Sequence, residues 1–159
     1  DLHKEYRRQR QMCIRDRYGS ALVFAAADPE PLSTPKTPED LAKRLADLEK
    51  RGENLAKRFE RPDDTFQVSV DEALFFSNSD QVQNDLLGEG GKLLGRVLKT
   101  EGLAKRLEVA FLNTLSREPS PGESEALNQY LEARSADEKG AWQQVLWALM
   151  TSSEMRFKR

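Results

Sequence analysis

Hydrophobic residues recur at helical spacing along most of the chain. Residues three, four and seven positions apart share one face of an α-helix, so such a spacing predicts an amphipathic helix with a buried stripe. Shorter stripes at residues 82–87 and 93–98 predict two short helices. The clearest stripe consists of Leu103, Leu107, Ala110, Phe111 and Leu115.

Another stripe follows a helix start at Thr37. The Thr37 side chain can accept the amide of Asp40, and Pro38 suits the first helical position because its missing N–H needs no partner there. Gly52 is expected to weaken the middle of this helix, since glycine loses more backbone freedom than other residues. The apolar positions expected to be buried are Leu41, Leu45, Leu48, Leu55 and Phe59.

Three serines precede an acidic residue by three positions and predict capping boxes at helix starts. They are Ser69, Ser120 and Ser135. The last of these helices carries Trp142 and Trp147, which are separated by about 140° around a helix of 100° per residue. Apolar residues on most of its circumference predict a central helix, and we expect Trp147→Ala to cost about 3–5 kcal/mol.

The same patterns indicate the fold class. Strand signals are nearly absent, with a brief alternation over residues 65–70. Four of the seven prolines fall within residues 29–38, which predicts an extended segment. We therefore expect an all-α protein, a compact bundle of about five to six short helices with an extended N-terminal linker. Residues 19–37 would be the linker, in which the short apolar run at residues 21–27 predicts a short helix or an extended segment, and residues 38–159 would be the helical domain.

Composition narrows the chemistry that this domain can perform. The chain has 159 residues, 38% of them hydrophobic, which suits one domain with a single core. No run approaches the roughly 18 apolar residues of a membrane span. One Cys and one His exclude an internal disulfide, a cysteine-rich zinc site, a histidine metal cage and a Ser-His-Asp triad. The sequence therefore indicates no enzyme, no metal site and no cofactor within this segment.

Charge is distributed unevenly, but the N-terminal segment explains this. Residues 1–17 carry six basic and three acidic residues, whereas the whole chain has a net charge of −2. The stretch Met12–Arg17 resembles the translation of a transposase end sequence used in preparing sequencing libraries. We therefore expect residues 1–18 to be an artefactual or disordered segment. The remaining acidic body argues against nucleic-acid binding.

The other motifs have simple structural explanations. The stretch Gly88–Lys92 lacks the spacing and the hydroxyl residue of a phosphate-binding loop. Acidic pairs such as Asp137/Glu138 lie at helix starts, where negative charge meets the positive end of the helix dipole. Aromatic residues at helical spacing favour a core, although a ligand groove that stacks on sugars stays open as an alternative.

Three stretches of the chain resemble a known family. They are residues 73–79, residues 112–123 with Leu-Ser-Arg-Glu-Pro, and residues 145–157 with Leu-Trp-Ala-Leu-Met. In this order they resemble the C-terminal domain of the planctomycete-type family of unknown function called DUF fifteen-fifty-three, or PSD-one, over about residues 65–159. Thr151 and Asp80 depart from the family pattern, which has Asn and Pro there.

The resemblance implies a fragment of a large, exported, extracytoplasmic protein whose upstream region often holds a haem c domain. It carries over no catalytic residue. We expect Arg117 to be a structural arginine that bonds helix-end carbonyls, and Asn78 and Ser79 to separate two helices. The positions that we assign to structural motifs are Asn78, Ser79, Arg117, Pro119, Trp147 and Glu154.

Two functions are consistent with this interpretation. The first is a non-catalytic structural or interaction domain that binds upstream domains of the same chain or a protein partner. The alternative is a part of a polysaccharide-processing or haem-dependent redox protein in which this segment lines a site. Aromatic and acidic residues within 63–85, together with Trp142, would then contact a glycan.

Overall fold

The computed structural model describes residues 16–27, 37–58, 74, 76–80, 82–88 and 93–157. Within these ranges the chain forms helices and turns and no strand, which confirms the all-α prediction. The predicted capping box at Ser69 and the brief alternation at residues 65–70 lie outside the described residues. The same holds for Phe59 and for the stretch Met12–Arg15.

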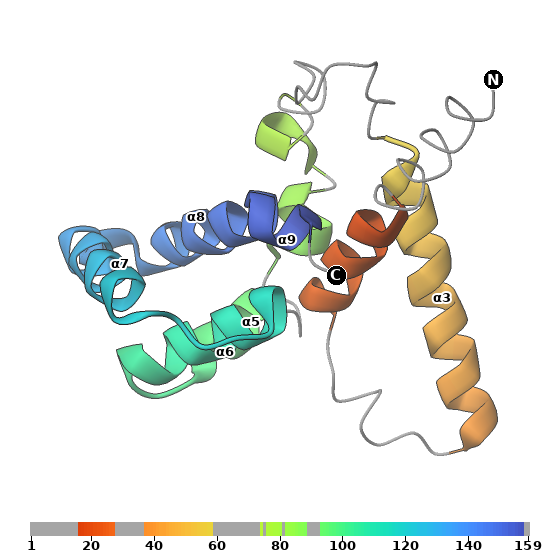
Figure 1. Cartoon of the computed structure of the whole chain (residues 1–159), viewed down its shortest axis with the longest axis horizontal. Coiled ribbons are helices and arrows are strands. Elements are labelled where there is room, and N and C mark those ends of the chain that lie inside the picture. Colours follow the sequence, from red (N-terminus) through yellow and green to blue (C-terminus); the bar gives the residue numbers. More distant parts are fainter. Residues whose placement is uncertain are drawn as a thin grey trace.

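The C-terminal half is a bundle of helices around one central helix. Its members are α5 (Leu93–Lys99), α6 (Leu103–Leu115), α7 (Pro121–Ala133), α8 (Glu138–Thr151) and α9 (Ser153–Phe157). Helix α8 packs against each of the other four (Figure 1). The central position that the apolar circumference predicted is therefore confirmed.

Two apolar stripes meet in this core. The α6 stripe buries Leu107, Ala110, Phe111 and Leu115, as its spacing predicted. Opposite it, α8 buries Ala141, Trp142, Val145, Leu146 and Met150. Trp142 is only 1% exposed, but Trp147 is 36% exposed. The expectation that Trp147 is a core residue is wrong, because the buried arc of α8 is centred on Trp142 and Leu146.

Of the two capping boxes predicted within the described residues, one is present. Ser120 accepts the Glu123 amide while the Glu123 carboxylate accepts the Ser120 amide, so the predicted box of α7 is confirmed. The predicted box at Ser135 is wrong. Residues Ser135–Asp137 form a 3₁₀ turn, η2, and Asp137 caps α8 by accepting the Gly140 amide at 3.0 Å. The Asp137 carboxylate is the side chain that reaches the first turn.

Helix α3 (Pro38–Ala56) begins as predicted, with the Asp40 amide donating to Thr37 Oγ1 at 3.1 Å. Only its second half is buried, at Leu48, Gly52, Leu55 and Ala56. Leu45 is 37% exposed, so the prediction that the whole apolar stripe is buried is wrong for the first half of α3. The reason is that the N-terminal half of α3 extends away from the rest of the protein (Figure 1).

A further helix covers residues 16–26, where the sequence analysis expected a terminal segment and a linker. Tyr18, Leu22 and Val23 are buried in the core, and Leu22 has no exposed surface. The chain is therefore a core helix at residues 16–18, where a disordered segment was expected, and at residues 19–26, where a linker was expected. Residues 28–36, which hold Pro29, Pro31 and Pro35, lie outside the described residues, as do residues 1–15.

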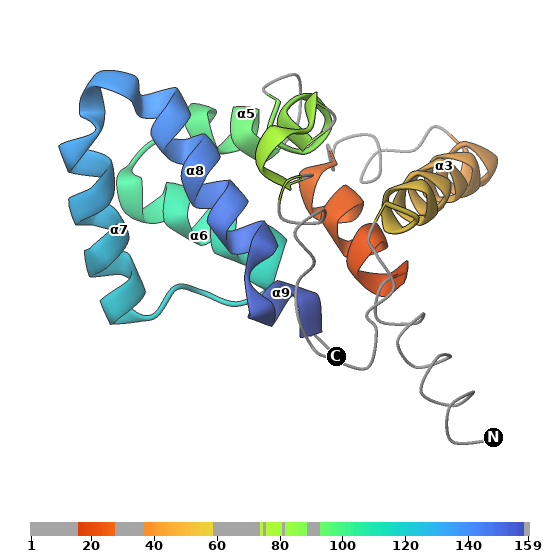
Figure 2. The ribbon, with the colours of Figure 1, turned by 90° about the horizontal axis from the view of Figure 1, so that it is seen from above.

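This helix lies between α3 and the bundle (Figures 1 and 2). It crosses α3 at two glycines. A Cβ atom on Gly19 would lie 2.5 Å from the carbonyl oxygen of Gly52, and one on Gly52 would lie 2.6 Å from Ser20 Cα. Because only glycine allows this backbone approach, Gly52 has a packing role that outweighs the cost expected for it in a helix.

The segment before α5 completes the core. Residues 76–78 are helical, Ser79 is not, and a π-helical turn, η1 (Val82–Leu86), follows. This is the break between two helical pieces that was expected at Asn78 and Ser79. Phe76, Val82, Leu86 and Leu87 are buried. The indole nitrogen of Trp147 donates to the Phe76 carbonyl at 3.1 Å, which fixes this segment on α8.

Candidate functional site

The most connected polar group in the described residues is Arg117, in the loop between α6 and α7. Ser116 ends α6 in the left-handed region, with φ 52° and ψ 33°. That conformation turns the chain sharply at the helix end. Arg117 follows directly, and Pro119 leads into the N-cap at Ser120. The loop therefore presents Arg117 beside the first turn of α7.

Arg117 binds two carboxylates at once. Its Nη1 and Nη2 atoms donate to Glu123 at 2.8 and 2.7 Å, and its Nε and Nη2 atoms donate to Glu154 at 2.7 and 2.8 Å. Nη1 also donates to the Glu118 carbonyl at 3.0 Å. The guanidinium lies 5.3 Å from the centre of the Phe111 ring. The planar arginine fork suits this arrangement, since each carboxylate can accept two parallel hydrogen bonds.

The electrostatics follow from these bonds. The hydrogen bonds from Arg117, followed by the bond from the Ser120 amide, lower the pKa of Glu123 to about 2. The hydrogen bonds from Glu123 and Glu154 in turn raise the pKa of Arg117 above its ordinary value. Glu123 is therefore ionised at neutral pH, and it serves both the capping box and the ion pair.

The Arg117 cluster is suited to holding helices together and not to proton transfer. At neutral pH a carboxylate with a pKa of about 2 is ionised and has no proton to donate. Arg117 is fully protonated and cannot accept a proton. The three side chains join α6, α7 and α9 through one cation. No group of three or more His, Cys, Asp or Glu side chains that could hold a metal ion occurs within the described ranges.

The role expected for Arg117 belongs to another arginine. Arg106 Nε donates to the Thr100 carbonyl at 2.7 Å and its Nη2 donates to the Leu98 carbonyl at 3.1 Å, at the end of α5. Its Nη1 also pairs with Glu138. Arg117 bonds carboxylates and one loop carbonyl, so the expectation that it bonds helix-end carbonyls is corrected. The short turn between α5 and α6 was the one sequence signal that could have pointed to Arg106.

A second cluster surrounds Tyr18. The Tyr18 hydroxyl donates to the Met150 carbonyl at 2.9 Å, and the Arg156 guanidinium lies 5.0 Å from the centre of the Tyr18 ring. The ring also packs against Phe76, with centroids 6.1 Å apart. Burial raises the Tyr18 pKa to about 12, although Arg156 acts in the opposite direction. Tyr18 is thus a neutral hydrogen-bond donor in the core.

The structure brings some of the expected motif residues together. Arg117 and Glu154 are directly bonded, and Pro119 lies in the same loop as Arg117. Trp147 contacts the segment that ends at Asn78 and Ser79 through the Phe76 carbonyl. Sequence reasoning missed Glu123 as a partner of Arg117 and Tyr18 as a core residue. The capping box was a usable signal for Glu123, whereas no sequence pattern pointed to Tyr18.

Comparison of the chain with protein-family models, with curated proteins and with solved structures finds no match in any of the three. None of the helices in the described part of the chain combines the length and the apolar character that crossing a membrane requires.

Proposed function

We propose that this chain is a non-catalytic helical module with a structural or interaction role in a large exported protein. One observation carries the proposal: the polar side chains around Arg117 and Arg106 are bonded to each other or to carbonyls near helix ends. Arg117 neutralises Glu123 and Glu154, and Arg106 bonds the carbonyls at the end of α5. Such groups hold helices in place.

The surface favoured for interaction is the projecting half of α3. Its first ten residues contain no buried side chain, while Leu41 and Leu45 continue the apolar line that Leu48 and Leu55 bury against the helix over residues 16–26. A partly uncovered apolar line on a helix gains stability when another surface covers it. The partner that we propose is an upstream domain of the same parent protein, where any haem c group would also reside.

The family resemblance over about residues 65–159 supports the extracytoplasmic part of the proposal. No nucleic acid is proposed as a partner, because the body of the chain is acidic.

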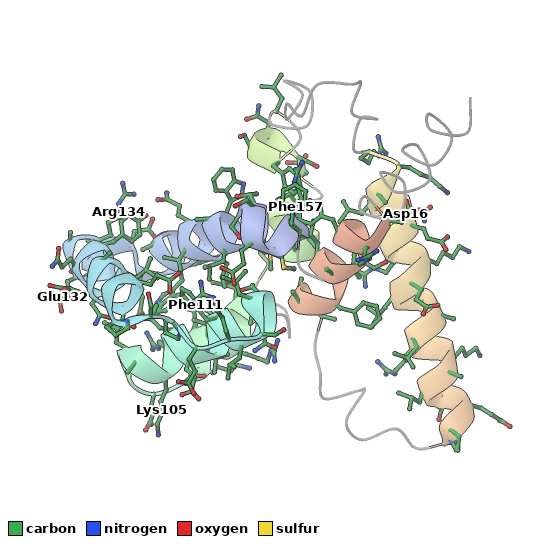
Figure 3. All side chains as sticks on the ribbon, viewed as in Figure 1. Asp16, Lys105, Phe111, Glu132, Arg134 and Phe157 are labelled. Atoms are coloured by element: carbon green, nitrogen blue, oxygen red, sulfur yellow. The ribbon has the colours of Figure 1, made fainter. Side chains whose placement is uncertain are left out.

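The test is lysine cross-linking of the purified chain to the separately purified upstream region of its parent protein. We expect cross-links from Lys43, which lies exposed on the projecting half of α3. Lys105 is the control, because it points away from the bundle on α6 (Figure 3). Equal labelling of Lys105 and Lys43, or no association at all, would refute the proposed surface.

A specific observation also favours glycan binding as the alternative. Trp147 exposes part of its ring close to the segment with Leu74, which is itself half exposed. An exposed tryptophan face is a common stacking surface for a sugar ring. Trp142, which the sequence offered for this role, is buried and unsuitable. A titration with soluble glycans should show saturable binding that Trp147→Leu abolishes and Phe157→Leu retains, with helicity unchanged in both.

A further inference from the structure

Helix α9 joins two parts of the protein that are distant in sequence. It follows α8 after a turn at Ser152, whose hydroxyl donates to the Leu149 carbonyl at 2.7 Å and accepts the Met155 amide at 3.2 Å. Figures 1 and 2 both show α9 beside the helix over residues 16–26. Helix α9 therefore lies between the bundle and the helix over residues 16–26. We call that helix and α3 together the N-terminal pair.

One side of α9 is fixed to the bundle. Glu154 binds Arg117 through two hydrogen bonds of 2.7 and 2.8 Å, and Met155 is buried in the core. Helix α9 also packs against α6 and α8. A helix of five residues has almost no stability of its own, so these side-chain contacts determine where it lies.

The other side of α9 holds the N-terminal pair. Arg156 covers the Tyr18 ring at 5.0 Å, and the Tyr18 hydroxyl bonds the Met150 carbonyl in the last turn of α8. Two successive turns of the C-terminal segment thus contact the same tyrosine. Because Glu154 and Arg156 are only two residues apart, a displacement of one displaces the other.

Helix α3 depends on this contact indirectly. Among the described residues it has no extensive interface with α5 to α9, and its close approach is to the helix over residues 16–26, at Gly19 and Gly52. The two helices of the N-terminal pair are therefore held to each other at the glycine crossing. The pair meets the bundle through Tyr18, Leu22 and their neighbours.

We propose that α9 is a clasp that couples the N-terminal pair to the bundle. When either side of the clasp is broken, the helix over residues 16–26 and α3 open away from the bundle together more often, while α5 to α8 stay folded. This device is independent of the function proposed above. It assigns the C-terminal Glu154 and Arg156 a joint role that neither has alone.

The test is hydrogen–deuterium exchange on the full chain with the variants Glu154→Gln and Arg156→Gln. In each we expect exchange in residues 16–26 and 38–56 to rise about two- to fivefold, the range of a single cation–π or ion-pair contact, with no change in α7. Arg156→Lys retains the cation and should restore part of the protection. Glu132→Gln is the matched control, on an exposed side chain of α7 (Figure 3).

The variants also give the results that would overturn the clasp. Faster exchange confined to residues 153–157 would show that α9 moves without releasing the N-terminal pair. Faster exchange of all helices, α7 included, would show global destabilisation and would equally refute a local release. A double variant that exchanges no faster than either single variant supports the clasp, because either side alone is then sufficient to open it.

Discussion

Gly19 and Gly52 face each other where two helices cross, and a Cβ atom on Gly19 would lie 2.5 Å from the Gly52 carbonyl oxygen. The same Cβ would lie 2.9 Å from the Ala56 side chain. At this crossing the two backbones are therefore in direct contact. The Gly52 carbonyl oxygen and the Ala56 Cβ are fixed to the backbone of α3 and cannot move aside as the end of a flexible side chain could. The docking of α3 depends on these two small residues.

Alanine at either glycine should separate the helices. For Gly52→Ala, the added methyl group would lie 2.6 Å from Ser20 Cα and 2.7 Å from Ser20 Oγ, and the chain must shift. We expect a loss of about 1–3 kcal/mol in the free energy of unfolding, typical of overpacking, despite the better helix propensity of alanine. Urea unfolding monitored by circular dichroism measures this difference.

Gly122→Ala is the matched control, because Gly122 lies in a helix with nothing within 4 Å of a Cβ atom. There the substitution should leave stability unchanged or raise it by up to about 1 kcal/mol. If Gly52→Ala were as well tolerated as Gly122→Ala, the close crossing would not exist in solution.

The caps of α8 give a second prediction. Asp137→Ala should reduce stability by about 1 kcal/mol, because the Asp137 carboxylate accepts the Gly140 amide in the first turn. Ser135→Ala should change stability by less than about 0.5 kcal/mol, since Ser135 lies in the preceding 3₁₀ turn. Thermal unfolding of both variants measures the difference. A larger loss of stability for Ser135→Ala than for Asp137→Ala would show that Ser135 caps α8, as the sequence pattern predicted.

Local signals predicted the fold well wherever the answer lies within one helix. The N-caps at Thr37 and Ser120 and the stripe of α6 are present as predicted. These features depend on neighbouring residues and on helical geometry, which the sequence contains directly. The break at Ser79 was predicted for the same reason.

Contacts between distant residues could not be predicted in this way. The apolar arc of α8 contains both tryptophans, and only the placement of α5, α6 and α7 decides which one is covered. Arg117 was recognised as structural, but Glu154 lies 37 residues away and its pairing depends on the α8–α9 turn. The core position of the helix over residues 16–26 was missed because a short apolar run carries no cap or stripe long enough to predict burial.

The two tryptophans provide a third prediction. Trp142→Ala should cost about 3–5 kcal/mol, because it empties a site in the centre of the core. Trp147→Ala should cost less, since its ring is partly exposed and the main loss is its hydrogen bond to Phe76 together with part of its buried surface. Chemical unfolding compares the two. Equal losses would contradict the packing of α8 described here.

The pH dependence of stability tests the Arg117 cluster. Glu123 has an ordinary pKa of 4.5, and its hydrogen bonds with Arg117 lower this to about 2 in the folded chain. A lowered pKa in the folded state means that the contribution of the ion pair is complete above the unfolded pKa. It is then lost progressively as the pH falls from about 4.5 to about 2.

We therefore expect the stability difference between the wild-type chain and Glu123→Gln to be constant from pH 7 to about 5.5 and to shrink as the pH falls toward 2. Glutamine can still accept the Ser120 amide in the capping box, so the variant mainly removes the charge. The measurement is urea unfolding at a series of pH values. Glu132→Gln, on the exposed face of α7, should show no such change, and a difference that stays constant down to pH 2 would mean that Glu123 is not held ionised by Arg117.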